Sequence, residues 1–374
     1  MSASTLLRLL VALAVFGGIA FYLNRPDAAP GRVGGLASGD VLFTDLDVNR
    51  VHTLAISGRD GEVHVRRGEN GWTVDELHGY PANFSIIAQF LRTLNDLKVG
   101  QVLRDGEASL EELALNADSD SSDRLVVTLS REGGDPVRLA LGVVKQTRAG
   151  AAGMPQGRFV RVNEGPVVLV DEQFMEINPF AREWVDRDLM QLPPELVDSI
   201  SVQRAGSAYT IRRTDDGSYG LEPMGDHEAV EQSAAVRLFQ ALQWLRFDEV
   251  YHPELSDEEV GIAAYDSVVF RTSEGLAYEL HVGRGDETLI SRPLRIKVSD
   301  VSPDQIHQQE ATRQQQRFEG WRYEIPVMIA TALIPPRESL VTLAETPVET
   351  GTAADAVSSE FEEIEDFAEE IPEP

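Results

Sequence analysis

Three segments between Val197 and Tyr251 decide the fold: VDSISV (197–202), YTIRRTDDGSYGL (209–221) and LFQALQWLRFDEVY (238–251). They repeat, in the same order, VHTLAI (51–56), VHVRRGENGWTV (63–74) and FLRTLNDLKVGQVL (90–103). Matched positions keep their type, as Leu54 does with Ile200, Arg66-Arg67 with Arg212-Arg213 and Trp72 with Tyr219. Because solenoid repeats run to roughly 20–50 residues, this longer period indicates duplication of a whole domain.

Each copy begins with alternating apolar residues separated by glycine-rich turns, which predict a three-stranded antiparallel meander. Helical spacing then predicts an amphipathic helix, over 229–245 in the second copy. In the first copy its apolar face comprises Phe84, Ile87, Phe90, Leu91, Leu94 and Leu97. A short motif, Ser109–Leu115, recurs at Ser256–Ile262, and a hairpin follows in which Leu141-Gly142 is echoed by Val282-Gly283. We therefore predict an α+β protein of two tandem duplicated modules, each a meander with a packed amphipathic helix and a following hairpin.

The remaining segments complete the predicted organisation. We expect an N-terminal membrane anchor at 1–25, a flexible linker at 26–41, the first module at 42–173 and a bridge at 174–194. The second module, with a C-terminal helix, is expected at 195–336, and a disordered acidic tail at 337–374. The tail assignment rests on about a dozen acidic residues after Arg337, with neither Lys nor Arg among them.

The N-terminal segment Thr5–Leu23 has about fifteen uncharged residues after Arg8. This length lies between a signal-peptide core and the roughly 17–25 residues of a membrane span. Counting back to Thr5, with Arg8 reaching to the interface, gives a short but sufficient span. We expect an uncleaved single-pass anchor; a cleaved signal peptide and a buried helix are the alternatives.

Composition excludes several classes of function. The formal net charge of −29 would repel a phosphate backbone, so nucleic-acid binding is disfavoured. The chain has no cysteine, which removes disulfides, thiolate metal sites and cysteine nucleophiles.

Known catalytic and ligand-binding motifs are also missing from the sequence. The seven histidines show neither H-x-x-x-H nor H-E-x-x-H spacing, and DSDSSD (118–123) lacks the Gly and terminal Glu of an EF-hand loop. There is no phosphate-binding glycine loop and no G-x-S-x-G elbow. Glu111-Glu112 and Glu258-Glu259 recur at matching places, but a solvated face of a short helix explains them better than acid–base chemistry. We therefore predict no catalytic, metal or cofactor-binding residues, and no enzymatic activity.

The repeated arginines Arg66, Arg67, Arg212 and Arg213 are the candidate partner-contact residues. Adjacent residues of a strand face opposite ways, so one arginine of each pair should lie on the outer face of its sheet. They would either form salt bridges within the sheet or contact a partner or an anionic polymer.

With this order of elements, the chain resembles the DUF4340 family from the N-terminal segment through Ile334. The resemblance is carried by Leu42-Phe43…Leu46…Val51, Gly71-Trp72, Tyr80-Pro81-Ala82, Trp184…Asp186-Arg187-Asp188-Leu189 and Gly320-Trp321…Ile325-Pro326. It implies a membrane-tethered bacterial protein, similar to extracytoplasmic auxiliary subunits of gliding-motility-type ABC transport systems. It carries over no catalytic residues and gives no account of the acidic tail.

The resulting expectation is a non-enzymatic inner-membrane protein whose bulk lies in the periplasm. It would act as an accessory or scaffold of an ABC transporter, contacting a permease or other envelope proteins, and exposed strand edges could accept partner strands. The alternative is a periplasmic ligand-binding or hydrolytic protein with its site between the modules. A structural envelope protein without a transporter partner is a third hypothesis.

Overall fold

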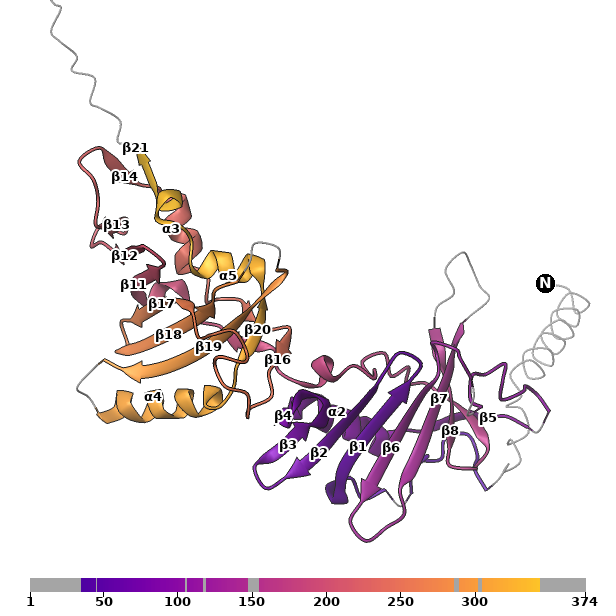
Figure 1. Cartoon of the computed structure of the whole chain (residues 1–374). Coiled ribbons are helices and arrows are strands. Elements are labelled where there is room, and N and C mark those ends of the chain that lie inside the picture. The colour runs from indigo at the N-terminus through magenta and orange to yellow at the C-terminus, as the bar shows by residue number, and fades with distance from the viewer. Residues whose placement is uncertain are drawn as a thin grey trace, which may run out of the picture.

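The computed structural model describes residues 35–44, 46–104, 106–116, 119–146, 155–285, 289–301 and 305–343 (Figure 1). Within these ranges the fold is α+β, as predicted, with mostly antiparallel sheets and few helices. No helix in the described ranges combines the length and apolarity needed to cross a membrane. The anchor expected at 1–25 lies outside the described residues.

The first sheet has nine strands in the order β4-β3-β2-β1-β6-β7-β8-β9-β5. Its strands are β1 (Val51–Gly58), β2 (Glu62–Gly68), β3 (Gly71–Val74), β4 (Tyr80–Pro81), β5 (Val99–Val102), β6 (Leu125–Arg131), β7 (Val137–Gln146), β8 (Pro155–Val162) and β9 (Val167–Val170). The short 3-10 helices η1 (Val48–Arg50) and η2 (Asp75–Leu77) flank the meander. Helix α2 (Phe84–Asp96) packs on one face and is capped by Asn83, whose Oδ1 accepts from the Ser85 amide at 3.0 Å.

The second sheet has eight strands in the order β13-β12-β11-β17-β18-β19-β20-β16. Its strands are β11 (Val197–Arg204), β12 (Ser207–Arg213), β13 (Tyr219–Glu222), β16 (Glu249–Val250), β17 (Tyr265–Thr272), β18 (Leu276–Gly283), β19 (Ser291–Asp300) and β20 (Tyr323–Pro326). The helices are α3 (Gln232–Phe239), α4 (Gln305–Phe318) and α5 (Val327–Leu333), with the 3-10 helices η4 (Pro194–Leu196) and η5 (Arg337–Leu340). A separate ribbon pairs β14 (Glu228–Val230) with β21 (Val341–Leu343).

Both sheets follow the same path. The strand order of the second sheet matches that of the first for every strand except β4, which has no counterpart. In this match β11, β12 and β13 correspond to β1, β2 and β3, and β17, β18, β19, β20 and β16 correspond to β6, β7, β8, β9 and β5. The pairing of each first strand also shifts register at the same place, between Val51 and Thr53 and between Val197 and Ser199. Positions in the two sheets can therefore be compared one by one.

The recurring short motif crosses the outer face of each sheet. Leu113 O lies over Gly142, where a Cβ atom would be 2.1 Å away, and Gly261 O lies over Gly283, where it would be 2.5 Å away. Each glycine is thus required because another segment's backbone passes too close for a side chain. The Val143 amide donates to Leu113 O at 3.0 Å, fixing the first crossing.

Aromatic side chains join the two modules. Tyr80 of β4 packs edge-on against rings of the second module, with centroid separations of 5.3 Å to Phe247, 4.9 Å to Trp321 and 6.2 Å to Tyr323. Burial raises the pKa of the Tyr80 and Tyr323 hydroxyls. The buried side chains of both modules form one continuous hydrophobic cluster, so the sheets are packed against each other at this junction.

The bridge contacts both modules. It contains η3 (Ala181–Trp184) and β10 (Asp188–Met190), and β10 pairs with β15 (Leu245–Arg246) of the second module. On the other side, the Asn83 amide donates to Trp184 O at 2.8 Å. The buried Trp184 ring donates from Nε1 to Asn178 O at 3.0 Å, as expected for a tryptophan in a core.

Some segments differ from the sequence-based expectation. The helix expected over 229–245 is limited to α3, because Glu228–Val230 pairs as β14 before it and residues 240–244 form turns that lead into β15. Residues 337–343, expected to be part of the tail, form η5 and β21; residues 344–374 lie outside the described ranges. At the other end, Gly39–Asp40 of the expected linker hydrogen-bonds to Val99 of β5.

Candidate interaction site

The repeated arginines divide between the two faces of their sheets, as strand alternation predicts. Arg66 lies on the outer face of the first sheet and forms an ion pair with Asp75 of η2. Arg212 is its exposed counterpart in β12, on the outer face of the second sheet. Arg67 and Arg213 lie on the helix-bearing face, at the margin of the core.

Arg67 and Arg213 contact corresponding backbone. Arg67 donates to Asn49 O of η1 at 3.1 Å, and Arg213 donates to Pro194 O of η4 at 2.6 Å. Each 3-10 turn immediately precedes the first strand of its sheet. One function of the repeated arginine is therefore structural, since it ties the second strand to the start of the first.

Beside Arg67 the first module has a cavity of about 250 Å³ between the meander and helix α2. It is lined by Val48, Asn49, Arg67, Trp72, Phe84, Ala88, Leu91 and Arg92. The lining combines an apolar floor with two guanidinium groups, a composition typical of sites that take an apolar group next to an anionic one.

Phe84 is the residue of this cavity that sequence reasoning missed. The helical period placed it on the buried face of α2, yet its side chain is 64% exposed, whereas Ile87, Phe90 and Leu94 are buried. Arg92, which donates to Ala88 O at 3.1 Å, lies on the same exposed surface of the helix. An exposed aromatic ring beside two arginines is typical of partner contacts.

The corresponding place in the second module is filled. The Arg213 guanidinium lies 5.8 Å from the Tyr219 ring centroid and 5.6 Å from that of Phe239, and these two rings are 4.6 Å apart. Phe239 stands where the first module has Leu91, and Tyr219 where it has Trp72. The first module therefore has a cavity beside Arg67, whereas aromatic side chains fill the corresponding space beside Arg213 in the second module.

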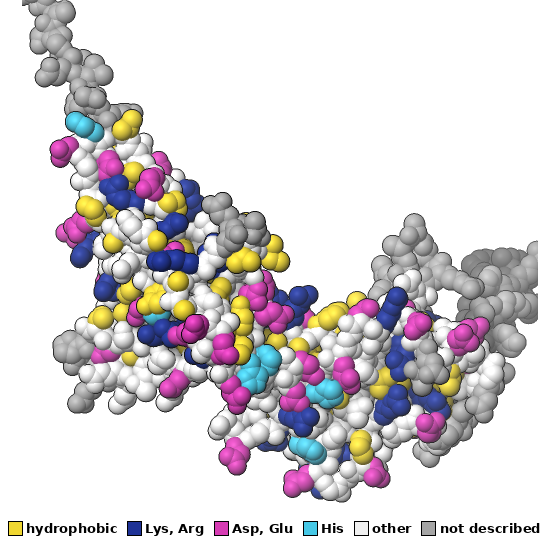
Figure 2. Space-filling view, in the orientation of Figure 1, with side chains coloured by type: hydrophobic (Ala, Val, Ile, Leu, Met, Phe, Trp, Pro, Cys, Tyr) yellow, Lys and Arg dark blue, Asp and Glu magenta, His cyan; other side chains and the backbone are white. Residues whose placement is uncertain are grey.

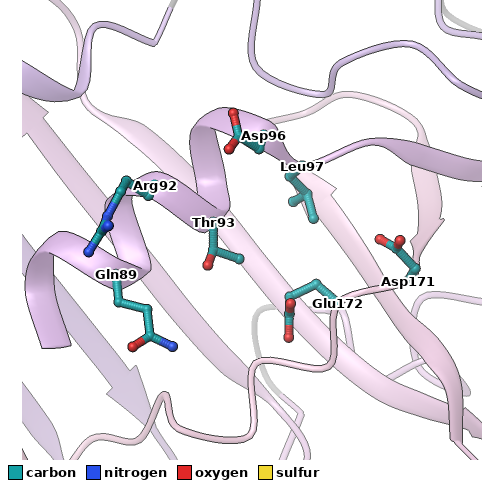
Figure 3. A pocket seen from close by; sticks show the side chains of 7 residues that line it. All are labelled: Gln89, Arg92, Thr93, Asp96, Leu97, Asp171 and Glu172. Carbon is teal, nitrogen blue, oxygen red and sulfur yellow. The ribbon is translucent and has the colours of Figure 1, made fainter.

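A wider groove adjoins this cavity and shares Arg92 with it. Its volume is about 520 Å³, and it is lined by Gln89, Arg92, Thr93, Asp96, Leu97, Asp171 and Glu172 (Figure 3). Its three carboxylates point in different directions, and Glu172 already accepts the amides of Gln173 and Phe174 at 3.0 and 3.3 Å. No group of three or more potential ligands among the described residues is placed to hold a metal ion. The groove is a polar extension of the surface around α2.

The repeated glutamate pairs have a structural explanation. Glu112 Oε2 accepts from the Ser109 amide at 2.9 Å, and Glu259 Oε2 accepts from the Ser256 amide at 2.8 Å. The serine hydroxyls in turn accept the glutamate amides, which completes a capping box in each motif. These hydrogen bonds lower the pKa of both carboxyl groups. Glu112 and Glu259 therefore each cap a short turn within their own motif.

Two other expected contact regions are occupied within the chain. The β5 edge is covered by residues 39–42, through hydrogen bonds from Gly39 and Leu42 to Val99 and Leu97. At the β13 edge, the Gln232 side chain bonds both the amide and the carbonyl of Tyr219, at 3.0 and 3.2 Å. Five cavities in the described part of the chain, those beside α2 and on the first sheet among them, are each lined by one module only. Partner-strand addition at these two edges is accordingly not favoured.

Comparison with known proteins gives one match. Residues 72–262, just over half of the 374 residues, match the family model described as "Domain of unknown function (DUF4340)". No curated protein and no solved structure matches the chain. The matched range runs from Trp72 in the cavity, through helix α2 and the bridge, to Ile262 at the end of the second short motif.

Proposed function

The chain belongs to the DUF4340 family, and from that premise we propose that it is a non-enzymatic accessory or scaffold protein of an ABC-type transport system. In this proposal residues 1–25 anchor it in the bacterial inner membrane and both modules project into the periplasm. We further propose that the modules arose by duplication, which is supported by their matching strand order and repeated sequence.

The observation that carries the proposal is the cavity beside Arg67. It presents an exposed Phe84 ring and two guanidinium groups over an apolar floor, in a chain with a net charge of −29. The closed counterpart in the second module supports separate roles for the modules. The first would bind the partner, and the second would extend the scaffold.

The chemistry of the cavity indicates what it would accept. An apolar side chain entering between Trp72 and Phe84 would bury apolar surface, at roughly 25 cal/mol per Å² removed from water. A carboxylate next to that side chain could be bound bidentately by Arg67 or Arg92. We therefore propose that the partner offers a periplasmic segment in which an apolar residue adjoins an acidic one.

Site-specific photocrosslinking in intact cells tests this proposal. A benzoylphenylalanine at Phe84 should form an adduct that mass spectrometry identifies as a permease or ATPase-associated subunit. The same probe at Trp244, an equally exposed aromatic residue of the second module, is the control and should give no such adduct. Recovery of no transporter subunit from Phe84, or equal recovery from both positions, would overturn the proposal.

A further inference from the structure

A second pocket lies on the outer face of the first sheet, on the side away from α2. Its volume is about 80 Å³, and it is lined by Leu115, Asn116, Arg124, Val126, Arg138, Ala140, Arg161, Asn163 and Glu164. Val126, Ala140 and Arg161 form one row across β6, β7 and β8, so Ala140 is the floor of the pocket. Figure 2 shows Lys and Arg side chains gathered over this part of the first module.

The three arginines retain hydrogen-bonding capacity. Arg124 donates from Nε to Asn116 O at 3.0 Å, and Arg161 donates from Nε to Gly165 O at 2.9 Å. The Arg138 guanidinium has no hydrogen bond or ion pair with another described residue. Glu164 is the one carboxylate in the lining; it lies 3.2 Å from Arg161, and its side chain is 94% exposed. The pocket lining thus contains three guanidinium groups and a single carboxylate, which is exposed to solvent.

Asn116 adds an independent sign of an unfilled site. Its Oδ1 atom is buried and has no hydrogen-bond partner among the described residues. An asparagine amide can be rotated so that its nitrogen takes the place of its oxygen. In that orientation Asn116 would offer a buried donor to an acceptor in the pocket, and a buried polar atom without a partner is costly.

In the second sheet the same place is filled by a side chain. The corresponding row is Ser267, His281 and Arg295, so His281 stands where the first sheet has Ala140. The buried imidazole stacks on Tyr265, with centroids 4.1 Å apart, and contacts Arg295 through Nδ1 at 2.9 Å. Tyr265 stands in the place of Arg124, and Arg295 in that of Arg161.

The charged side chains around Ala140 in the first sheet also differ from those around His281 in the second. His281 contacts Glu279, and Arg295 forms an ion pair with Asp257, so the second sheet supplies its own acids. The corresponding positions in the first sheet are Arg138 and Leu110. The first sheet therefore has an open space where the second has an imidazole ring, and an arginine and a leucine where the second has two acidic side chains.

We propose that this pocket binds a phosphate-type oxyanion, either inorganic phosphate or the phosphate group of a monoester. Arg124, Arg138 and Arg161 would donate to its oxygens, because guanidinium groups match this geometry and keep their charge. A volume of about 80 Å³ suits such a group, since drug-sized ligands occupy roughly 300–1,000 Å³. This pocket is separate from the Phe84 cavity, so the proposal of phosphate binding is independent of the proposed transporter partnership.

Calorimetric titration of the full chain with sodium phosphate tests this, with ionic strength held constant by sodium chloride. The wild type should bind phosphate saturably. Arg138→Gln should weaken the affinity about tenfold or more, because it removes a charged hydrogen-bond donor. Ala140→Leu should abolish binding by filling the hole while leaving all three arginines in place. Arg212→Gln, which removes an exposed arginine from the outer face of the second sheet, should leave the affinity unchanged.

The outcomes separate the pocket from general charge attraction. Absence of binding in the wild type, or equal affinity in all variants, would overturn the proposal. Weakening by Arg138→Gln with no effect of Ala140→Leu would also overturn it, because the anion would then sit on the surface. A parallel titration with glycerol 3-phosphate distinguishes the sources: tighter binding than phosphate indicates a monoester or headgroup, and equal or weaker binding indicates the free ion. Circular dichroism confirms that each variant is folded.

Discussion

Arg67 and Arg213 show how a single side chain can secure the start of a sheet. Each reaches from the end of the second strand to a carbonyl of the 3-10 turn before the first strand. In the second module the guanidinium also covers two aromatic rings, which adds a cation–π contact. Arg212, one residue earlier, faces outward, and its side chain forms no hydrogen bond or ion pair with another described residue.

Replacing Arg213 by alanine should lower the free energy of unfolding by about 1 kcal/mol, through the lost hydrogen bond and cation–π contact. Arg212→Ala should change it by less than about 0.5 kcal/mol, as surface substitutions usually do. Urea denaturation of both variants measures the difference. Equal effects would mean that the contact to Pro194 O contributes nothing to stability.

Gly142 is constrained by packing, because the short motif passes directly over it. Gly142→Ala should destabilise the protein by at least about 2 kcal/mol, since a Cβ atom 2.1 Å from Leu113 O forces the motif away from the strand. Gly134→Ala is the control, because its nearest contact is the Arg131 side chain at 3.6 Å. Thermal unfolding of both variants checks the order; a Gly142→Ala variant as stable as the control would contradict it.

At the scale of elements, an ion pair adds to the backbone pairing of β14 with β21. The Arg337 guanidinium donates to both carboxylate oxygens of Glu228, from Nη1 to Oε1 at 2.9 Å, and the Gly225 amide adds a third bond at 2.7 Å. Chiefly through Arg337, these bonds lower the pKa of Glu228 to about 2. The pair holds the end of the described chain against the second module.

This pKa predicts the direction of a pH effect. A carboxyl group with a depressed folded-state pKa contributes stability above its unfolded pKa of roughly 4.3, and that contribution is lost as the pH falls toward 2. Glu228→Gln should therefore be less stable than the wild type at pH 7 and should lose less stability between pH 4.5 and 2. Urea midpoints across this range measure it. Glu69→Gln, in the turn between β2 and β3, should follow the wild-type profile, and an identical profile for Glu228→Gln would contradict the assignment.

The elements themselves show what a sequence can and cannot predict here. Alternation, turn glycines and helical spacing predicted the α+β class, the meanders and helix α2, since these signals are local. Periodicity places Phe84 on the same stripe as Ile87, but it does not say where the packed surface beneath the helix ends. The pairings of β14 and β15, on either side of α3, depend on strands distant in sequence. The cavity beside Arg67 depends on how side chains fill the space between the meander and helix α2, which no local sequence pattern indicates.

At the scale of the molecule, the aromatic junction makes the two sheets a single packed body. Tyr80→Ala should remove the ring that contacts Phe247, Trp321 and Tyr323, at a cost of about 3–5 kcal/mol, the range for truncating a buried aromatic side chain. It should also split one calorimetric transition into two, because the modules then unfold separately. Phe84→Ala, which truncates an exposed ring, should keep a single transition near the wild-type temperature. A single undiminished transition in Tyr80→Ala would show that the junction does not couple the modules.

The strand order of the first sheet also fixes a distance. The described chain enters along β5, at one edge, while the junction with the second module is formed by β4, at the other. Nine strands span eight intervals of about 4.8 Å, or roughly 38 Å across the sheet. The first module therefore also acts as a spacer: its width sets how far the second module stands from the point where residues 35–42 join the fold.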